Sequence, residues 1–212
     1  MRRFDALWIL IVVLLLFPRC GEKRKPTQSQ GFSFDFPNSV GSCWHYRRYQ
    51  LSNFSNPDSI PDSITVLEVV DSIVAVDTLV DGREVKKWLH VSAAGGSSFT
   101  YVLVDQKGVW EYWSVSETTY YQRIVEFPLR VGRMRYYRYS KDSVLALETV
   151  SVPAGVFEEC YKVRRYDLIP MYHIPTDIET WFKSGVGIVK RREDSYTLGM
   201  SIYEELTSFQ VK

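Results

Sequence analysis

The chain has 212 residues, with 26 basic and 25 acidic side chains and a formal net charge of +1, which leaves room for one domain or two small ones. A near-neutral chain lacks the clustered basic charge that sequence-independent binding of nucleic acid requires, so we expect no nucleic-acid partner. Hydrophobic residues make up 45% of the sequence and aromatic residues 15%, a content that predicts a folded core and argues against disorder.

The N-terminus is typical of an export signal. Arg2 and Arg3 precede an uninterrupted apolar run from Ala6 to Phe17, which ends at Pro18. This run is too short to cross a hydrocarbon core of about 30 Å, which needs about 20 apolar residues. A basic start, a short apolar run and then a break describe a secretory signal. We therefore predict export and assign residues 1–20 to a signal helix.

Cys20 follows this run and is the candidate for lipidation. Bacterial lipoprotein signals, which this segment resembles, usually place Leu three residues before the cysteine and small residues between them. Here those positions hold Phe17, Pro18 and Arg19. Three outcomes stay open: a lipid on Cys20, plain secretion, or retention of the segment as a short membrane anchor. We predict a cell-envelope lipoprotein whose partner is the membrane, reached through the lipid or the signal segment.

Residues 21–35 are polar and predict a flexible tether. They include the basic cluster from Lys23 to Lys25 followed by Pro26, and such a segment buries too little apolar surface to offset the entropy of ordering it. Without residues 1–20 the chain loses three arginines and one aspartate, which brings its net charge to −1. The basic cluster therefore belongs to a linker rather than to a basic domain.

Two parts of the remaining chain share an ordered set of features. The frame Phe-Pro-x-x-Val-Gly, followed by an aromatic strand, occurs at residues 36–41 and 127–132. A Ser-led aliphatic run and then a Gly-Val pair follow each copy, at residues 63–68 and 108–109 in the first and at 143–148 and 185–186 in the second. Chance agreement is the alternative explanation. We predict two similar β-repeats, residues 36–126 and 127–212, which superpose strand for strand within one continuous β domain.

The local pattern within both parts is that of β-strands. Asp81-Gly82 separates two alternating runs, which is a strong hairpin signal, and Pro153-Ala154-Gly155 predicts a turn between strands. Beyond the signal segment, no stretch of eleven or more residues has a helical period. The fold class is therefore predicted to be all-β and antiparallel, with about a dozen strands in a curved sheet, a barrel or a sandwich. The most expected exception is a short helical turn within residues 167–177, where Pro170 and Pro175 disrupt strand pairing.

Two segments resemble a signature of uncharacterised exported bacterial β-proteins, many of which are known only as lipoproteins. They are Val-Pro-Ala-Gly-x-Phe-x-x-Cys at residues 152–160 and Gly-Val-Gly-x-Val-Lys at residues 185–190, and the frame at 127–132 belongs to the same pattern. The resemblance covers about residues 127–193. It implies an all-β exported domain and carries no known chemistry.

Residues suited to catalysis or metal binding are scattered. His45, His90 and His173 are the three histidines, and none has metal-ligand spacing to another histidine, a cysteine or a carboxylate motif. Residues Gly95 to Ser98 do not form a nucleophile elbow and indicate a flexible hairpin loop. Carboxylates occur mostly singly along the expected strands, so the sequence nominates no carboxylate pair, although two distant carboxylates could still meet in space. We predict no metal, no cofactor and no catalysis, with His173, in a loop, as the position where a catalytic role would be least surprising.

Two cysteines and three aromatic-basic segments leave alternatives open. Once Cys20 is assigned to lipidation, Cys43 and Cys160 either pair as a disulfide in an oxidising compartment or stay as two buried thiols. Aromatic and basic residues are interleaved at residues 46–49, 133–139 and 162–166. Two interpretations stay open. Such strands bind a lipid, a glycan or a protein, or their side chains pair with those of neighbouring strands on half-exposed faces. The sequence names no ligand-binding residue.

These features predict an exported, membrane-tethered, non-catalytic envelope or surface protein that acts by binding. The leading alternative is a carrier of a lipid or acyl chain in a half-barrel, which would require an apolar cavity of roughly several hundred Å³. A third hypothesis is a hydrolase with a non-local site. It would require titratable groups with perturbed pKa values that converge in a cleft.

Overall fold

The computed structural model describes residues 34–212, except for residues 53–62, 118–120, 138, 170–173 and 196–197. The predicted signal segment, Cys20, most of the predicted tether and His173 lie outside the described residues. Within the described part of the chain there is no helix that could cross a membrane.

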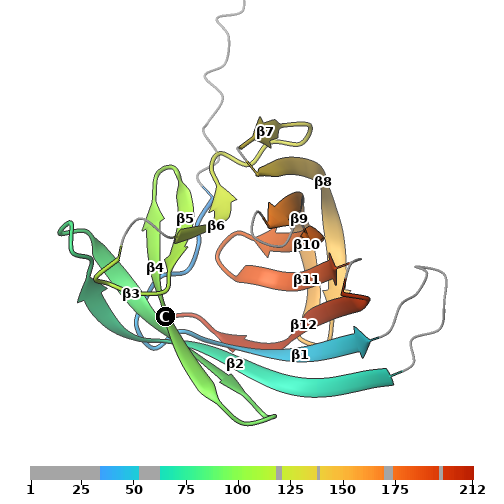
Figure 1. Cartoon of the computed structure of the whole chain (residues 1–212), viewed down its shortest axis with the longest axis horizontal. Coiled ribbons are helices and arrows are strands. Elements are labelled where there is room, and N and C mark those ends of the chain that lie inside the picture. Colours follow the sequence, from blue (N-terminus) through green and yellow to red (C-terminus); the bar gives the residue numbers. More distant parts are fainter. Residues whose placement is uncertain (1–33, 53–62, 118–120, 138, 170–173, 196–197) are drawn as a thin grey trace, which may run out of the picture. The chain divides into compact units, whose positions relative to one another are not determined.

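Among the described residues, twelve strands form one antiparallel sheet (Figure 1). They are β1 (Cys43–Ser52), β2 (Ser63–Thr78), β3 (Glu84–Ser92), β4 (Ser97–Asp105), β5 (Gly108–Tyr112), β6 (Tyr121–Glu126), β7 (Met134–Tyr136), β8 (Ser140–Val152), β9 (Gly155–Ile169), β10 (Ile174–Lys183), β11 (Gly187–Ser195) and β12 (Met200–Gln210). The order across the sheet is β6-β5-β4-β3-β2-β1-β12-β11-β10-β9-β8-β7. The all-β antiparallel prediction is confirmed, and of its three architectures the curved, unclosed sheet is the one observed.

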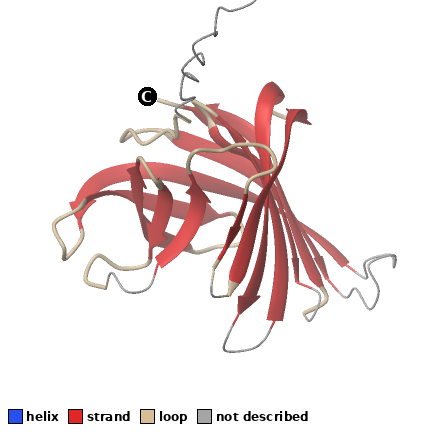
Figure 2. Cartoon of the chain, turned by 90° about the horizontal axis from the view of Figure 1, so that it is seen from above, coloured by secondary structure: helices blue, strands red, loops and turns tan. Residues whose placement is uncertain are grey.

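The chain fills this sheet as two successive meanders. Strands β1 to β6 each pair with the next along the chain, as do β7 to β12, and pairing of β1 with β12 joins the two series. The sheet curls, so that its inner side faces a shared core (Figures 1 and 2). Its two edge strands, β6 and β7, follow one another in the sequence.

The Val-Gly end of the Phe-Pro-x-x-Val-Gly frame takes the same turn in both halves. Gly41 and Gly132 both have positive φ angles, +90° and +83°, which glycine adopts without steric cost. The Gly41 amide donates to the Ile73 carbonyl (2.8 Å), and the Gly132 amide donates to the Val144 carbonyl (2.9 Å). In return, the Ile73 amide donates to the carbonyl of the residue after Gly41 (3.0 Å), and the Val144 amide donates to the carbonyl of the residue after Gly132 (2.9 Å).

Strands β2 and β8 each contain a shift in pairing register at an equivalent position. This equivalence corrects one detail of the predicted repeat. The pairing register shifts between Ile73 and Ala75 and again between Val144 and Ala146. The run at residues 143–148 therefore corresponds to residues 72–77 and not, as predicted, to residues 63–68. Both runs begin with serine and continue with aliphatic residues, so composition alone could not distinguish them. Superposition of the complete halves stays a prediction.

The predicted helical turn within residues 167–177 is wrong for the described part of that segment. Strand β9 continues to Ile169 and β10 begins at Ile174. Pro175 lies opposite Leu168 of β9, while pairing of β10 with β11 begins only at Thr176. Because Pro175 precedes the region that pairs on both sides, its missing N–H costs no hydrogen bond to β11.

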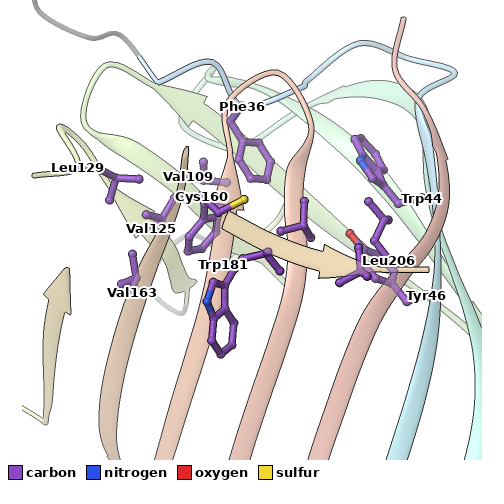
Figure 3. Close-up of a cluster of buried hydrophobic side chains, with 14 of the residues drawn as sticks. Phe36, Trp44, Tyr46, Val109, Val125, Leu129, Cys160, Val163, Trp181 and Leu206 are labelled. Carbon is purple, nitrogen blue, oxygen red and sulfur yellow. The ribbon is translucent and has the colours of Figure 1, made fainter. Parts of the chain in front are cut away.

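The largest hydrophobic cluster fills the inner side of the curl, and Figure 3 shows part of it. Trp44 is 1% exposed, its ring stacks on that of Trp88 with centroids 5.0 Å apart, and its Nε1–H donates to the Val186 carbonyl at 2.7 Å. Val186 itself packs against the cluster. Trp44 therefore links β1, β3 and the turn between β10 and β11.

Buried charges connect the region near the two edges of the sheet. The Asp142 carboxylate on β8 accepts hydrogen bonds from Arg165 Nε on β9 and from Arg123 Nε on β6, each at 3.0 Å. Arg135 on β7 forms a further ion pair with Glu126 on β6, at 3.1 Å. Side chains thus bridge β6 to β7 and β8, although the backbones of β6 and β7 are not paired with each other.

Candidate ligand-binding cavity

A cavity of about 550 Å³ opens on the inner side of the sheet, a volume within the range of small-molecule sites. Part of its lining is apolar and comes from Phe36, Tyr46, Val69, Trp88, Val102, Val109, Ile124 and Ile188. The charged and hydroxyl side chains of the lining are those of Arg48, Asp71, His90, Ser92, Ser97, Ser98, Thr100, Glu111, Arg191 and Glu204. The cavity is therefore mixed in character.

Strand register brings four of the polar residues together. Asp71 on β2 lies opposite His90 on β3, and Trp88, two residues before His90, lies opposite Thr100 on β4. Because side chains alternate between the two faces of a strand, His90 and Thr100 share the inner face. Glu111 on β5 joins them because it lies opposite Val102, two residues after Thr100.

His90 is the centre of a hydrogen-bond network in this cavity. Its Nδ1 donates to Asp71 Oδ1 at 2.8 Å, since a carboxylate can only accept. Its Nε2 lies 2.8 Å from Thr100 Oγ1 and 4.0 Å from Glu111 Oε1. The His90 side chain is 26% exposed. Both ring nitrogens are thus engaged, and a second carboxylate lies just beyond hydrogen-bond distance.

The surroundings of His90 act on its pKa in opposite directions. Burial lowers the pKa, whereas the hydrogen bond to Asp71 and the negative charges of Asp71, Glu111 and Glu204 raise it. The net pKa of His90 is raised above the ordinary value. The cavity therefore favours the doubly protonated, positively charged imidazole.

We expect replacement of His90 with glutamine to flatten the pH dependence of stability. Since the folded-state pKa is raised, the contribution of His90 to stability is complete below its unfolded pKa of about 6.5 and is lost as pH rises through the folded pKa. Urea unfolding of the wild-type chain should thus show a free energy that falls across this range. His45→Gln is the control because His45 does not line the cavity. Equal slopes for the wild type and His90→Gln would contradict the assignment.

Two further ion pairs border the cavity. Arg48 on β1 binds the Glu204 carboxylate on β12 through Nε (2.7 Å) and Nη2 (2.5 Å), and Arg191 Nη2 on β11 lies 2.8 Å from Glu193 Oε2. Other groups at the cavity keep hydrogen-bonding capacity: Trp88 Nε1 and Arg191 Nε are buried and have no hydrogen-bond partner among the described residues. Among all the described residues, no group of three or more His, Cys, Asp or Glu side chains is arranged to hold a metal ion.

Cys43 and Cys160 are free thiols in the structure. Cys43 Sγ accepts a hydrogen bond from Ser72 Oγ at 3.3 Å and lies 3.5 Å from His45 Nε2. Cys160 is buried and its Sγ donates to the Phe157 carbonyl at 3.4 Å. Burial raises the pKa of the Cys160 thiol and so lowers its reactivity. Of the two alternatives left open, the structure has separate thiols.

The aromatic-basic segments pair largely with neighbouring strands. Arg47 binds Glu68, and Lys162 binds Glu179, at 3.1 and 2.9 Å. Tyr46 and Arg48 are the members of these segments that also line the cavity. Residues Gly95 to Ser98 line it as well. This segment, interpreted from the sequence as a flexible hairpin loop, includes the first two residues of β4 and lies at the site.

Sequence reasoning missed Asp71, His90, Thr100 and Glu111 as a group because each stands alone on a different strand. The available signal was a polar residue at an inward position of an alternating strand, for example Asp71 between Val69 and Ile73, which are both buried. A polar group among core positions is more informative than an exposed one. Only the register of four strands shows that these positions meet.

No protein-family model and no curated protein matches the sequence. Solved structures do resemble it. One is the crystal structure of a Bacteroides fragilis protein inferred to be exported and described as having a YmcC-like fold, with a TM-score of 0.51, 18% identity and coverage of 84% of this chain and 99% of that one. The fold is YmcC-like. A Parabacteroides distasonis protein inferred to be a lipoprotein gives a TM-score of 0.50 at 14% identity, with the same coverage.

Proposed function

We propose that this YmcC-like protein is exported and acts by binding a small polar ligand in the cavity, without catalysing a reaction on it. The observation that carries the proposal is the convergence of Asp71, His90, Thr100 and Glu111 on one cavity of about 550 Å³. Ligand sites combine apolar walls with placed polar groups that fix the orientation of the ligand, and this mixed lining provides both. Export is supported by the signal-like residues 1–20 and by the description of the two similar structures as exported or lipoprotein.

The lining argues against an acyl chain as the ligand. Methylene groups packed against Glu111, whose carboxylate has only the 4.0 Å contact to His90 among the described residues, would remove its charge from water without offering it a hydrogen bond. Burial of an unpaired charge costs several kcal/mol. A ligand with hydrogen-bonding groups avoids this cost, and the polar ligand is therefore favoured over the lipid carrier.

One observation favours a hydrolase as a second candidate. Asp71, His90 and Thr100 follow one another at hydrogen-bond distances of 2.8 Å, as do an orienting acid, a base and a nucleophile in a hydrolytic site. Against this, the raised pKa of His90 reduces the fraction of imidazole able to accept a proton, and Thr100 is only 8% exposed. Binding without turnover accounts better for both facts.

The test is to identify what the cavity holds. The full chain is purified from its native envelope, and co-purifying small molecules are identified by mass spectrometry. We expect a polar molecule with the wild type and at least about tenfold less with Glu111→Gln, because that carboxylate faces the cavity and accepts no hydrogen bond from the described residues. Glu68→Gln, in an exposed ion pair, is the control and should retain the ligand.

Two results would contradict this proposal. Equal recovery of the molecule with wild type and Glu111→Gln would show that the cavity does not hold it. Conversion of the molecule to a product by the wild type, but not by a folded His90→Gln variant, would establish the hydrolase instead.

Membrane tethering is proposed to occur through a lipid on Cys20. We expect the wild type in the membrane fraction and Cys20→Ala in the soluble exported fraction, because loss of the thiol removes the attachment point. Cys43→Ala, which changes a cysteine within β1, is the control and should stay membrane-bound. Membrane association of Cys20→Ala would instead indicate an uncleaved anchor, and recovery of a chain lacking residues 1–20 outside the cytoplasm would refute the signal.

A further inference from the structure

We propose that the ligand is a neutral, polyhydroxylated molecule of mono- or disaccharide size. This inference rests on the proposed binding function and names its ligand class. It derives from three properties of the cavity: its balanced charge, its unused hydrogen-bonding groups and its aromatic wall.

The charges that face the cavity compensate one another. Three carboxylates, on Asp71, Glu111 and Glu204, face two guanidinium groups, on Arg48 and Arg191, and the imidazole of His90. Asp71 is bound to His90, Glu204 is bound to Arg48, and Arg191 contacts Glu193 outside the lining. With His90 protonated, the lining carries no net charge that would select an anion or a cation.

The residues of the lining include both hydrogen-bond donors and a hydrogen-bond acceptor that have no partner among the described residues. Trp88 Nε1–H and Arg191 Nε–H are buried donors without a hydrogen-bond partner among the described residues. The Glu111 carboxylate, with a side chain 17% exposed, has only the 4.0 Å contact to His90 within that part of the chain.

These three groups discriminate between ligand classes. A carboxylate or phosphate could accept from the two donors, but it would meet the negative charge of Glu111. An ammonium could donate to Glu111, but it would leave both donors unpaired. A hydroxyl group both donates and accepts, so a molecule with several hydroxyl groups donates to Glu111 and, after a small side-chain shift that exposes the two buried donors, accepts from both without adding charge.

The remaining lining suits a ring with hydroxyl groups at its edge and C–H groups on its faces. Phe36, Tyr46 and Trp88 contribute aromatic surface, and Trp88 is held in place by its stack on Trp44. Tyr46 is likewise fixed, because its hydroxyl donates to the Ile188 carbonyl at 3.0 Å. Further hydroxyl groups line the same cavity on Ser92, Ser97, Ser98 and Thr100.

The experiment titrates the purified full chain with sugars that share one ring and differ in charge. Glucose, galactose, N-acetylglucosamine, maltose and lactose are the neutral probes, glucuronate is the anionic probe and glucosamine the cationic one. Binding is measured by tryptophan fluorescence, to which Trp88 contributes, and by saturation-transfer NMR. We expect a neutral sugar to bind, and both charged probes to bind at least about tenfold more weakly.

Variants of the cavity assign the binding to the named groups. Glu111→Gln and Arg191→Lys should each weaken binding of the neutral sugar by about tenfold or more, since the first removes a charged acceptor and the second removes the Nε–H donor. Glu68→Gln should leave it unchanged, because its exposed side chain pairs with Arg47 and is not part of the lining.

The outcomes separate the ligand class from the proposed function. Stronger binding of glucuronate or glucosamine, or no binding of any neutral probe, overturns the ligand class. The binding function still stands in that case, provided that Glu111→Gln loses the molecule that co-purifies with the wild type. If Glu111→Gln loses neither the sugar nor the co-purifying molecule, both proposals fail.

Discussion

Replacing Asp142 with alanine is expected to lower the free energy of unfolding by about 3–5 kcal/mol, the range measured when one partner of a buried ion pair is removed. The Asp142 residue is 7% exposed, and its carboxylate lies between two guanidinium groups. The side chains of Arg123 and Arg165 are themselves 11% and 10% exposed. The alanine variant would leave both charges buried without the carboxylate that they share.

Urea unfolding of Asp142→Ala beside the wild type measures this loss. Glu68→Ala is the matched control, since its ion pair with Arg47 is exposed and exposed pairs contribute only about 0–1 kcal/mol. Similar losses in the two variants would contradict the role given to Asp142. A loss confined to Asp142→Ala would show that the ion pairs near the sheet edges stabilise the curl.

The stability of Asp142→Ala should also depend on acidic pH differently from that of the wild type. Burial raises the pKa of Asp142, but the hydrogen bonds and charges of Arg165 and Arg123 outweigh that effect and hold the pKa below its usual value. Its contribution to stability is therefore present above the unfolded pKa of about 3.9 and is lost as pH falls through the folded value. Unfolding of Asp142→Ala should depend less on pH in this acidic range than unfolding of the wild type.

Replacing Trp44 with alanine is expected to cost about 3–5 kcal/mol of stability, as does removal of large aromatic side chains from other cores. Trp44 is 1% exposed, stacks on Trp88 and donates to the Val186 carbonyl. The variant would leave a cavity, lose the aromatic contact and deprive that carbonyl of its side-chain donor. Since Trp88 lines the ligand cavity, ligand binding should weaken as well.

Trp113→Ala is the control for this prediction. Trp113 is 56% exposed, and exposed substitutions usually change stability by less than about 0.5 kcal/mol. Thermal or urea unfolding of the two variants compares a buried and an exposed tryptophan in the same chain. A small loss for Trp44→Ala would mean that the contacts around Val186 and Trp88 are not part of the stable core.

The strands of this fold are readable from the sequence because their signals are local. Asp81-Gly82 forms the predicted turn, with Gly82 at φ +86°, and Pro153-Ala154 forms another between β8 and β9. The order of the strands is not local. Pairing of β1 with β12 joins Cys43 to Gln210, and no pattern within either strand specifies a partner so distant along the chain.

The residues of the cavity could not be identified from the sequence for the same physical reason. Asp71 and Glu111 each look like a single polar residue in an alternating strand, and His90 has no neighbour in the sequence that suggests a role. Strand alternation places each of them on a face, but only the register between strands brings them to one point. Composition argues against a basic nucleic-acid surface, but it does not locate a site assembled from four strands.

Pairing of the first strand with the last has a consequence for biosynthesis. A chain that crosses a membrane N-terminus first delivers β1 early, and β2 can cover only one of its sides. Its other side presents unpaired backbone N–H and C=O groups, which can recruit another chain. That side is covered by β12, which emerges after the other eleven strands of the sheet. Completion of the sheet is therefore late, and the interval favours rapid translocation or a chaperone that holds the exposed edge.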